Sequence, residues 1–245
     1  MTGLRLAFSW LTVLPIRGPD TVDRTLAKKA IAFTPVVGLV LGGVAAGLLW
    51  LLEHRIEPSL AGLLTVAALI LATRSMHLDG LADTFDGLGC YGPPERAREV
   101  MRSGSAGPFG VAAIVVSIGV QSLSLGFLGF SEEWAAIVIA VCTGRVAVVL
   151  ACRQGIRASS DTGFGALVAG TQPLWIGLVW SAALVVAAAF ALDCWWQLPL
   201  AVVVVLALSM LFVAHCAKRF GGVSGDVLGA VIEVTVASCA VGALL

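Results

Sequence analysis

Long apolar runs alternate with short polar segments along the 245 residues of this chain. An α-helix rises about 1.5 Å per residue, so about 20 apolar residues cross the roughly 30 Å hydrocarbon core of a bilayer. The apolar runs predict seven membrane-spanning helices at 30–52, 59–75, 106–128, 134–152, 173–192, 196–214 and 227–245. The predicted fold class is therefore all-α: a polytopic integral membrane helical bundle that forms one domain over residues 1–245.

Composition supports this interpretation. The chain is 59% hydrophobic and 12% charged, whereas soluble domains carry about 25% charged residues. The expected surroundings are a lipid bilayer, and no nucleic-acid partner is expected. Residues 1–17 are too short to span and have no cleavage site of a signal peptide, so we predict a helix lying in the membrane interface.

The basic residues are distributed unevenly among the loops. All except Arg55 lie before the first predicted span or in alternate loops after it, whereas the other loops carry acids such as Glu132 and Asp193. The positive-inside rule then places the N-terminus in the cytoplasm. Three longer polar segments, 74–105, 153–172 and 215–230, are expected on that same side, where they would form the active-site loops.

The most unusual segment is HLDGLADTFDGLG, residues 77–89. Asp79, Asp83 and Asp86 are spaced i, i+4, i+7, which places all three carboxylates on one face of a helix. Gly80 and Gly87 form a stripe without side chains beside them, which we interpret as a groove for substrate. Like charges this close repel, and a divalent cation relieves that repulsion. The pattern predicts a Mg²⁺ site, with Mn²⁺ as the alternative ion, completed by phosphate oxygens of a substrate.

The other two polar segments supply complementary groups. Glycine-rich backbone beside cationic side chains is typical of phosphate binding. His77 lies on the far side of the acidic helix, where an interfacial histidine held by hydrogen bonds is more typical than a metal ligand. The predicted substrate-binding residues are His77, Gly80, Gly87, Arg153, Arg157, Lys218, Arg219, Ser224 and Gly225.

Two further acids occur at the start of the last predicted span. Asp226 and Glu233 are seven residues apart, so both side chains share one helix face. An ionisable residue inside a span indicates function unless it is paired, and pairing of Glu233 with Arg145 is the alternative. We predict that this helix packs beside the 77–89 helix, with Asp226 nearer the metal. Acids for a metal together with basic groups for phosphate indicate phosphoryl-type transfer.

Two other functions fit parts of this pattern. A CDP-alcohol phosphotransferase is also embedded in the membrane and metal-dependent, but its acids follow a different spacing with an early arginine. An ion-coupled transporter could use Asp79 and Glu233, but the acids gather at one membrane face and no repeated half is visible.

Several motifs together resemble the cobalamin synthase family, the adenosylcobinamide-GDP ribazoletransferases. They are HLDGLADTFDGLG, GPFG at 107–110, LTVLPI near the N-terminus, AFTPVVGLVLG in the first span and GGVSGDVLGAVIE near the end. The resemblance implies an enzyme of the bacterial cytoplasmic membrane. It would join adenosylcobinamide-GDP to α-ribazole or α-ribazole 5′-phosphate and release GMP, with Mg²⁺ as cofactor.

The family's metal-site acids would correspond to Asp79, Asp83, Asp86, Asp226 and Glu233, with Asp83 or Asp86 handling the proton of the acceptor hydroxyl. The chain departs from the family where Ser103, Gly104 and Ser105 replace a frequent Asp-Ser-Arg, so Arg102 is expected to supply the missing phosphate contact. Ile232 stands where an asparagine is frequent. A homo-oligomeric state is left open.

Overall fold

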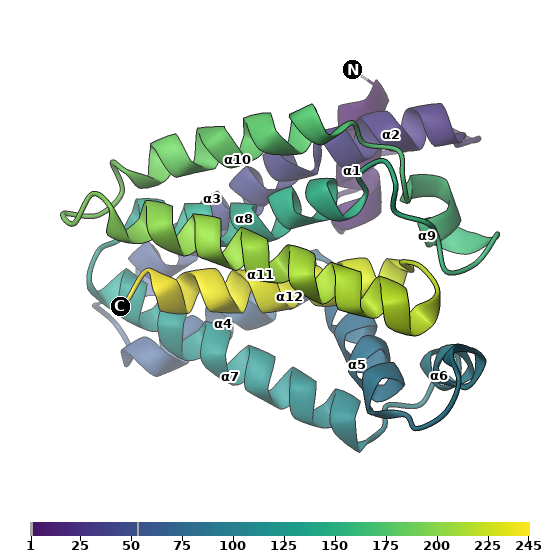
Figure 1. Cartoon of the computed structure of the whole chain (residues 1–245). Coiled ribbons are helices and arrows are strands. Elements are labelled where there is room, and N and C mark those ends of the chain that lie inside the picture. Colours follow the sequence, from purple (N-terminus) through teal and green to yellow (C-terminus); the bar gives the residue numbers. More distant parts are fainter. Residues whose placement is uncertain (1, 53) are drawn as a thin grey trace.

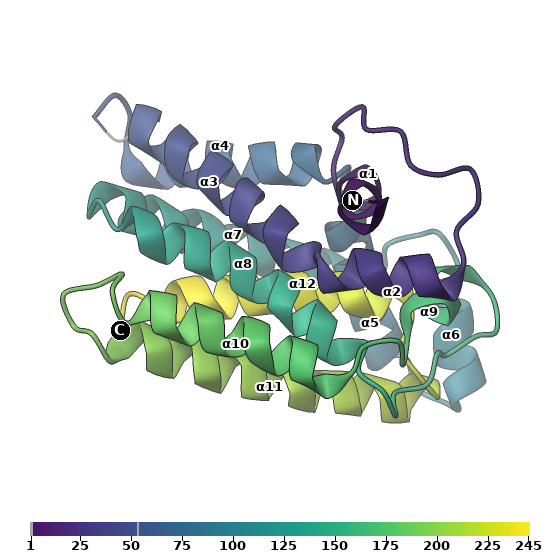
Figure 2. The ribbon, with the colours of Figure 1, turned by 90° about the horizontal axis from the view of Figure 1, so that it is seen from above.

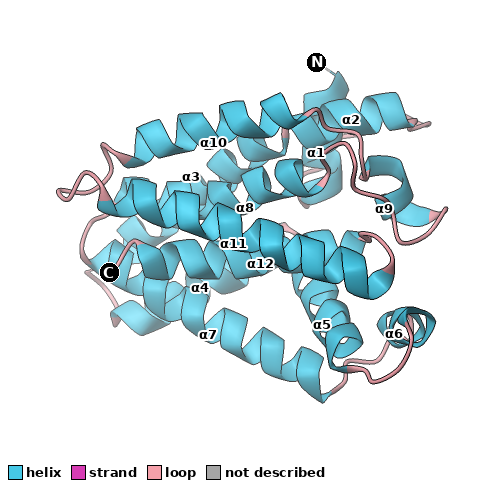
Figure 3. Ribbon diagram, in the orientation of Figure 1, coloured by secondary structure: helices cyan, strands magenta, loops and turns pink. Residues whose placement is uncertain are grey.

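The structure is a computed structural model that describes residues 2–52 and 54–245; Met1, at the start of the predicted interfacial segment, lies outside the described residues. The described chain consists of helices and connecting loops, with no strand among these residues (Figure 3). The helices are α1 (Thr2–Leu11), α2 (Arg24–Ala32), α3 (Thr34–Leu52), α4 (Pro58–Ala72), α5 (Met76–Gly89), α6 (Pro94–Met101), α7 (Pro108–Phe130), α8 (Trp134–Ala151), α9 (Gly163–Val168), α10 (Leu174–Ala188), α11 (Gln197–Phe220) and α12 (Gly225–Gly242). The predicted all-α class is confirmed.

The long apolar helices run along a common direction, with α8 and α12 inside the bundle (Figures 1 and 2). In the spanning windows, 83% of the α8 residues and 61% of the α12 residues are buried, against 33% in α11. Glycines permit the closest approach: a Cβ at Gly42 of α3 would lie 2.8 Å from the Cα atom of Val138 in α8. The α3–α8 contact therefore depends on a small residue at this position.

Five helices in the described chain are long and apolar enough to cross a membrane: α3, α7, α8, α11 and α12. The bent pair α4 and α5 would make a sixth span. α10 is apolar but has only 15 residues, or about 22 Å of helix. The predicted bundle of apolar helices is thus confirmed, but the predicted count of seven crossings is not.

α4 and α5 meet at a sharp break, with an angle of 93° between them. Arg74 and Ser75 both have φ of 56°, in the left-handed region that non-glycine residues rarely adopt. The Arg74 guanidinium donates to the backbone oxygens of Ser9 (3.1 Å) and Trp10 (2.7 Å), near the end of α1. These bonds hold the break against α1, which, like α5, runs across the bundle direction (Figure 1). The predicted interfacial helix corresponds to α1.

The three predicted loop segments gather at one end of the bundle, the right-hand end of Figure 1, where α5, α6 and α9 lie. The 153–172 segment is joined to the loop before α12 by a parallel bridge between Ala158 and Val223. The Val223 N–H donates to the Arg157 oxygen (2.9 Å), and the Ser159 N–H donates to the Val223 oxygen (3.0 Å). The predicted gathering of these segments is confirmed, and their cytoplasmic location stays a prediction.

Candidate active site

The acidic segment forms α5, as predicted, but its three aspartates have different surroundings. Asp79 is exposed, Asp83 is partly buried and Asp86 is buried. Both oxygens of Asp86 are engaged: the Gly107 N–H donates to Oδ2 (2.6 Å) and the Gly110 N–H donates to Oδ1 (2.9 Å). Asp86 thus accepts hydrogen bonds from N–H groups at the start of α7 that have no partner within the helix. Both N–H groups belong to the GPFG motif.

Asp226 lies directly against α5, as predicted. A Cβ at Gly80 would be 2.7 Å from the Asp226 backbone oxygen, and a Cβ at Gly229 would be 3.1 Å from the His77 oxygen. A Cβ at Gly87 would meet the Met101 side chain at 2.7 Å. Our interpretation of the glycine stripe as an open substrate groove is therefore wrong: a side-chain-free stripe also permits close helix contact, and here it is filled by α12 and α6.

The carboxylates of the cluster influence one another. Burial, followed by the negative charges of Asp226, Asp79 and Asp86, raises the pKa of Asp83 to about 6. The Ser224 hydroxyl donates to Asp226 Oδ2 (3.1 Å) and also accepts from the Val227 N–H at the start of α12. Asp79, Asp83 and Asp226 thus form an acidic cluster, and Arg102 is close enough for its positive charge to act on Asp226.

Carboxylate oxygens are ligands that Mg²⁺ accepts, but the carboxylates of this cluster do not by themselves surround an ion. Among residues 2–52 and 54–245, no group of three or more His, Cys, Asp or Glu side chains is close enough to hold a metal ion. Mutual repulsion keeps such carboxylates apart. Mg²⁺ typically takes only one or two carboxylates and completes its shell with water and substrate phosphate, so two of these acids suffice.

A polar cavity of 370 Å³ opens beside Asp226. Each of the three loop segments contributes to its wall. Its lining includes Arg98, Arg102, Ser159, Ser160, Thr162, Gly163, Phe164, Gly165, Ser224, Gly225 and Asp226. Two guanidinium groups, several hydroxyls and glycine backbone are the groups that bind phosphate. The structure thus brings the predicted Arg102, Ser224 and Gly225 together.

A second cavity, of 310 Å³, also lies beside Asp226 and shares Phe164, Gly225 and Asp226 with the polar cavity. Most of its wall is apolar, from α1, α2, α5, α8 and α12, and its polar members are Thr34, His77, Asp79, Arg145 and Asp226. The acidic cluster therefore lies where a polar and an apolar cavity meet.

Glu233 is separate from the acidic cluster. The Gln121 amide donates to Glu233 Oε2 (2.6 Å), and His77 Nδ1 lies 4.0 Å from Glu233 Oε1. Glu233 lines a small cavity of 20 Å³ together with His77, Gln121 and Arg145, and it lines neither of the two larger cavities that Asp226 lines. Its surroundings favour the alternative of an internal polar cluster with Arg145 over a metal ligand.

The expectation of a hydrogen-bonded His77 at the interface is wrong. His77 is buried in the bundle, and neither ring nitrogen has a hydrogen-bond partner among the described residues. It nevertheless lines the apolar cavity, as a substrate-binding residue should.

Four predicted basic residues lie outside both cavities that meet at Asp226. Arg153 donates to the Leu150 oxygen (3.2 Å), and Arg219 donates to the Cys90 oxygen (2.6 Å), which ties α11 to the end of α5. Arg157 and Lys218 are exposed. The sequence placed these four basic residues in polar loop segments but did not show the face on which each side chain would emerge. The prediction of a loop is wrong for Lys218 and Arg219, which lie in the last turn of α11.

Residues that we did not predict also line the site. Arg98 on α6 lines the polar cavity and donates to the Phe220 oxygen (2.9 Å). Trp10 and Phe164 line the apolar cavity with ring centroids 5.1 Å apart and ring planes at 72°. The sequence offered no signal for the Trp10–Phe164 contact, because α1 and α9 are far apart in the chain and meet only in the fold.

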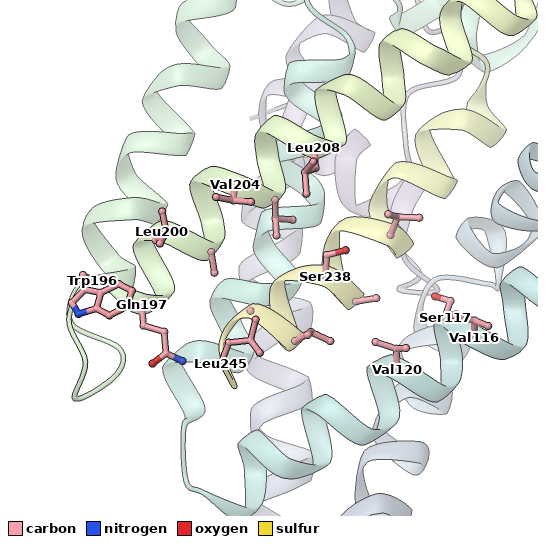
Figure 4. Close-up of a pocket in the computed structure, with 16 residues that line it drawn as sticks. Val116, Ser117, Val120, Trp196, Gln197, Leu200, Val204, Leu208, Ser238 and Leu245 are labelled. Carbon is pink, nitrogen blue, oxygen red and sulfur yellow. The ribbon is translucent and has the colours of Figure 1, made fainter.

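A further cavity, of 650 Å³, is not part of this site. It lies between α7, α11 and α12, with Val120, Val204 and Leu245 among its labelled residues (Figure 4). None of its described lining residues is charged. An apolar groove between spanning helices is suited to lipid contact rather than to phosphate chemistry.

The helical bundle with apolar spans is that of an integral membrane protein, and the acidic cluster and polar cavity at one end contain groups suited to phosphate chemistry. A family profile described as cobalamin-5-phosphate synthase matches residues 3–244, and the chain belongs to that family. The expected resemblance is confirmed over the whole chain, and with it the class of enzyme, a transferase.

Curated relatives named adenosylcobinamide-GDP ribazoletransferase support the same assignment. The protein of Corynebacterium efficiens is 38% identical over 247 residues, covering 98% of this chain and 90% of the relative. That of Nocardioides is 39% identical over 235 residues, covering 96% and 94%. That of Caldanaerobacter subterraneus is 31% identical over 236 residues, covering 95% and 94%. No solved structure matches the chain.

Proposed function

We propose that this protein joins adenosylcobinamide-GDP to α-ribazole or its 5′-phosphate, giving adenosylcobalamin or its 5′-phosphate and GMP. The relatives' name supplies the substrates. The observation that carries the proposal is the acidic cluster of Asp79, Asp83 and Asp226, because its member Asp226 lines a cavity that also contains Arg98 and Arg102.

The reaction exchanges one bond to phosphorus for another. The acceptor hydroxyl of ribazole forms a bond to the phosphorus that carries cobinamide, and the bond from that phosphorus to the bridging oxygen of GMP breaks. Arg98, Arg102 and the hydroxyls of the polar cavity bind the diphosphate and stabilise the charge that develops on GMP. The corrinoid is too large for either cavity and would lie outside them, at the membrane surface.

Asp79 and Asp226 would hold Mg²⁺, with Mn²⁺ as an alternative. The bound ion would neutralise phosphate charge as a Lewis acid. Asp83 would accept the proton of the acceptor hydroxyl, because its partly buried carboxylate lies near those of Asp79 and Asp226 and a carboxylate beside the substrate can act as a general base. Asp86 would position α5 against α7, since both of its oxygens already accept backbone N–H groups.

The protein would reside in the bacterial cytoplasmic membrane with its N-terminus and the active site on the cytoplasmic face. The basic residues of α6 and of the loops at the active-site end agree with the positive-inside rule. Both substrates are large and polar, so a site at the cytoplasmic end gives them direct access from water.

Purified protein in detergent or nanodiscs tests the proposal. With adenosylcobinamide-GDP, α-ribazole and Mg²⁺, we expect GMP and adenosylcobalamin in equal amounts. EDTA should stop the reaction, and Mg²⁺ or Mn²⁺ in excess should restore it. Release of GMP without a corrinoid product, or full activity in EDTA, would contradict the proposed reaction or the metal. A CDP-alcohol with a lipid acceptor is the negative control, since the alternative phosphotransferase would release CMP.

A further inference from the structure

The apolar cavity beside the acidic cluster contains groups that the transfer of phosphate alone does not explain. Its wall is formed by Trp10 and Leu11 of α1, Ile31 of α2, Met76 of α5 and Phe164 of α9, among other residues. At 310 Å³, its volume is at the lower end of the range of about 300–1,000 Å³ for small-molecule sites. It is therefore a site for a compact, mostly apolar group.

Two buried polar side chains also line this cavity. His77 is 4% exposed and Arg145 is 5% exposed. Both ring nitrogens of His77 and Nε of Arg145 have no hydrogen-bond partner among the described residues. A buried polar group without a partner costs about 1–3 kcal/mol, so these nitrogens indicate that a ligand with a hydrogen-bond acceptor binds here.

We propose that this cavity binds the base of the acceptor, 5,6-dimethylbenzimidazole in α-ribazole, and this proposal rests on the proposed function. The base is flat and apolar, and once attached to ribose it has a single ring nitrogen that accepts a hydrogen bond. Trp10 and Phe164 contact its faces or edges, and His77 or Arg145 donates to that nitrogen. Guanine, with several donors and acceptors, matches the polar cavity instead.

The position of the cavity gives the acceptor a suitable orientation. Asp79 and Asp226 lie in its wall, and Asp226 also lies in the wall of the polar cavity. A base held in the apolar cavity thus places its ribose towards the acidic cluster, with the donor diphosphate on the other side. The attacking hydroxyl then approaches phosphorus from the side opposite its bond to GMP, and that bond breaks, as an in-line displacement requires.

Steady-state kinetics of the full-length protein test the aromatic contact. Stacking of a base on an aromatic side chain contributes about 1–3 kcal/mol, so Trp10→Ala and Phe164→Ala should each raise the KM for α-ribazole about 5- to 150-fold. The KM for adenosylcobinamide-GDP should change less than twofold in Trp10→Ala, because Trp10 does not line the polar cavity, and Trp10→Phe should recover most of the affinity for α-ribazole. The matched control is Trp175→Ala, because Trp175 is 63% exposed on α10 and should leave both constants unchanged.

A substrate analogue separates recognition of the base from folding defects. Benzimidazole riboside lacks the two methyl groups, each of which contributes about 0.8 kcal/mol when buried, so wild-type protein should bind it about tenfold more weakly. The ratio of the affinities for α-ribazole and benzimidazole riboside should be smaller in Trp10→Ala than in the wild type. Equilibrium dialysis with labelled α-ribazole, in the absence of the donor, should show that the wild type binds α-ribazole more tightly than Trp10→Ala does.

The outcomes separate the two proposals. If wild-type protein releases no GMP and forms no cobalamin, the proposed function fails. If the wild type is active but Trp10→Ala and Phe164→Ala leave the KM for α-ribazole unchanged, or Trp10→Ala raises both KM values equally, the base is bound elsewhere. Equal affinity of the wild type for α-ribazole and its demethylated analogue would also overturn the base site.

Discussion

Replacing Asp83 with asparagine should stabilise the protein while it removes activity. Burial and the neighbouring carboxylates raise the pKa of Asp83 from the ordinary 3.8 to about 6. The charged form is therefore disfavoured in the fold. Stability from this group is fully present below about pH 4 and is lost as the pH rises through about 6.

The magnitude follows from the same values. Each pKa unit corresponds to about 1.4 kcal/mol, so the largest cost of the charge at pH 7 is about 3 kcal/mol. Asp83 is partly exposed, and solvent screening reduces the cost to about 1–2 kcal/mol. For a chain of this size that corresponds to about 2–8 °C in Tm.

Thermal unfolding monitored by tryptophan fluorescence, in EDTA and over pH 4–8, measures the effect. Asp83→Asn should exceed the wild type in Tm at pH 7 and match it at pH 4. Mg²⁺ should reduce the difference in Tm between Asp83→Asn and the wild type at pH 7, because a cation relieves the repulsion on Asp83. The matched control is Asp161→Asn, an exposed acid in the 153–172 loop, which should leave the pH profile unchanged.

Two results would refute this reasoning. The first is Asp83→Asn with a Tm at pH 7 equal to or below that of the wild type. The second is an Asp161→Asn profile that shifts as much as that of Asp83→Asn. In either case the carboxylates do not repel one another as the structure indicates. Turnover by Asp83→Asn should fall by at least about 100-fold, the usual contribution of a general base, and near-normal turnover would exclude Asp83 as the proton acceptor.

Three further predictions concern the fold around the site. In a background without native cysteines, labels at Glu95→Cys and Glu132→Cys should report opposite sides of the membrane; same-side labelling would contradict the topology. Gly80→Ala should lower the free energy of unfolding by about 1–3 kcal/mol and reduce activity, because its Cβ meets the Asp226 backbone. Gly47→Ala, with open space around its Cβ, should be neutral or stabilising. Equal effects of the two variants in thermal unfolding would argue against the tight α5–α12 contact. Glu233→Gln should lower stability by about 1–3 kcal/mol with little change in either KM, and a selective loss of Mg²⁺ affinity would instead restore Glu233 to the metal site.

Much of the fold was predictable because the apolar runs are long and the loops between them carry the charges. The acidic helix was predictable because its three aspartates follow the helix period. The bounds of α10 were harder to predict, because an apolar run does not show where a helix ends. The predicted span was 173–192, whereas the helix is Leu174–Ala188. The small helix α6 was not predicted; it carries Arg98 of the polar cavity, and Arg102 follows directly at its end.

The site was only partly predictable, since a residue type does not reveal its neighbours. Gly80 was interpreted as part of a groove, yet the absence of a side chain serves helix contact equally well. Arg153 has the chemistry of a phosphate ligand, but its position beside Leu150 and Met210 follows from the path of the chain after α8. Trp10 enters the site only because Arg74 holds the end of α1 at the α4–α5 break.

The contact between Asp86 and the start of α7 has an evolutionary consequence. A Cβ at Gly107 would lie 2.6 Å from Asp86 Oδ1, and a Cβ at Gly110 would collide with the same carboxylate. Neither glycine can therefore change while Asp86 stays, and loss of Asp86 would leave two N–H groups unsatisfied. The acidic helix and the GPFG segment should thus be inherited as one unit, and swapping either segment alone between distant relatives should yield a chimera less stable than a swap of both.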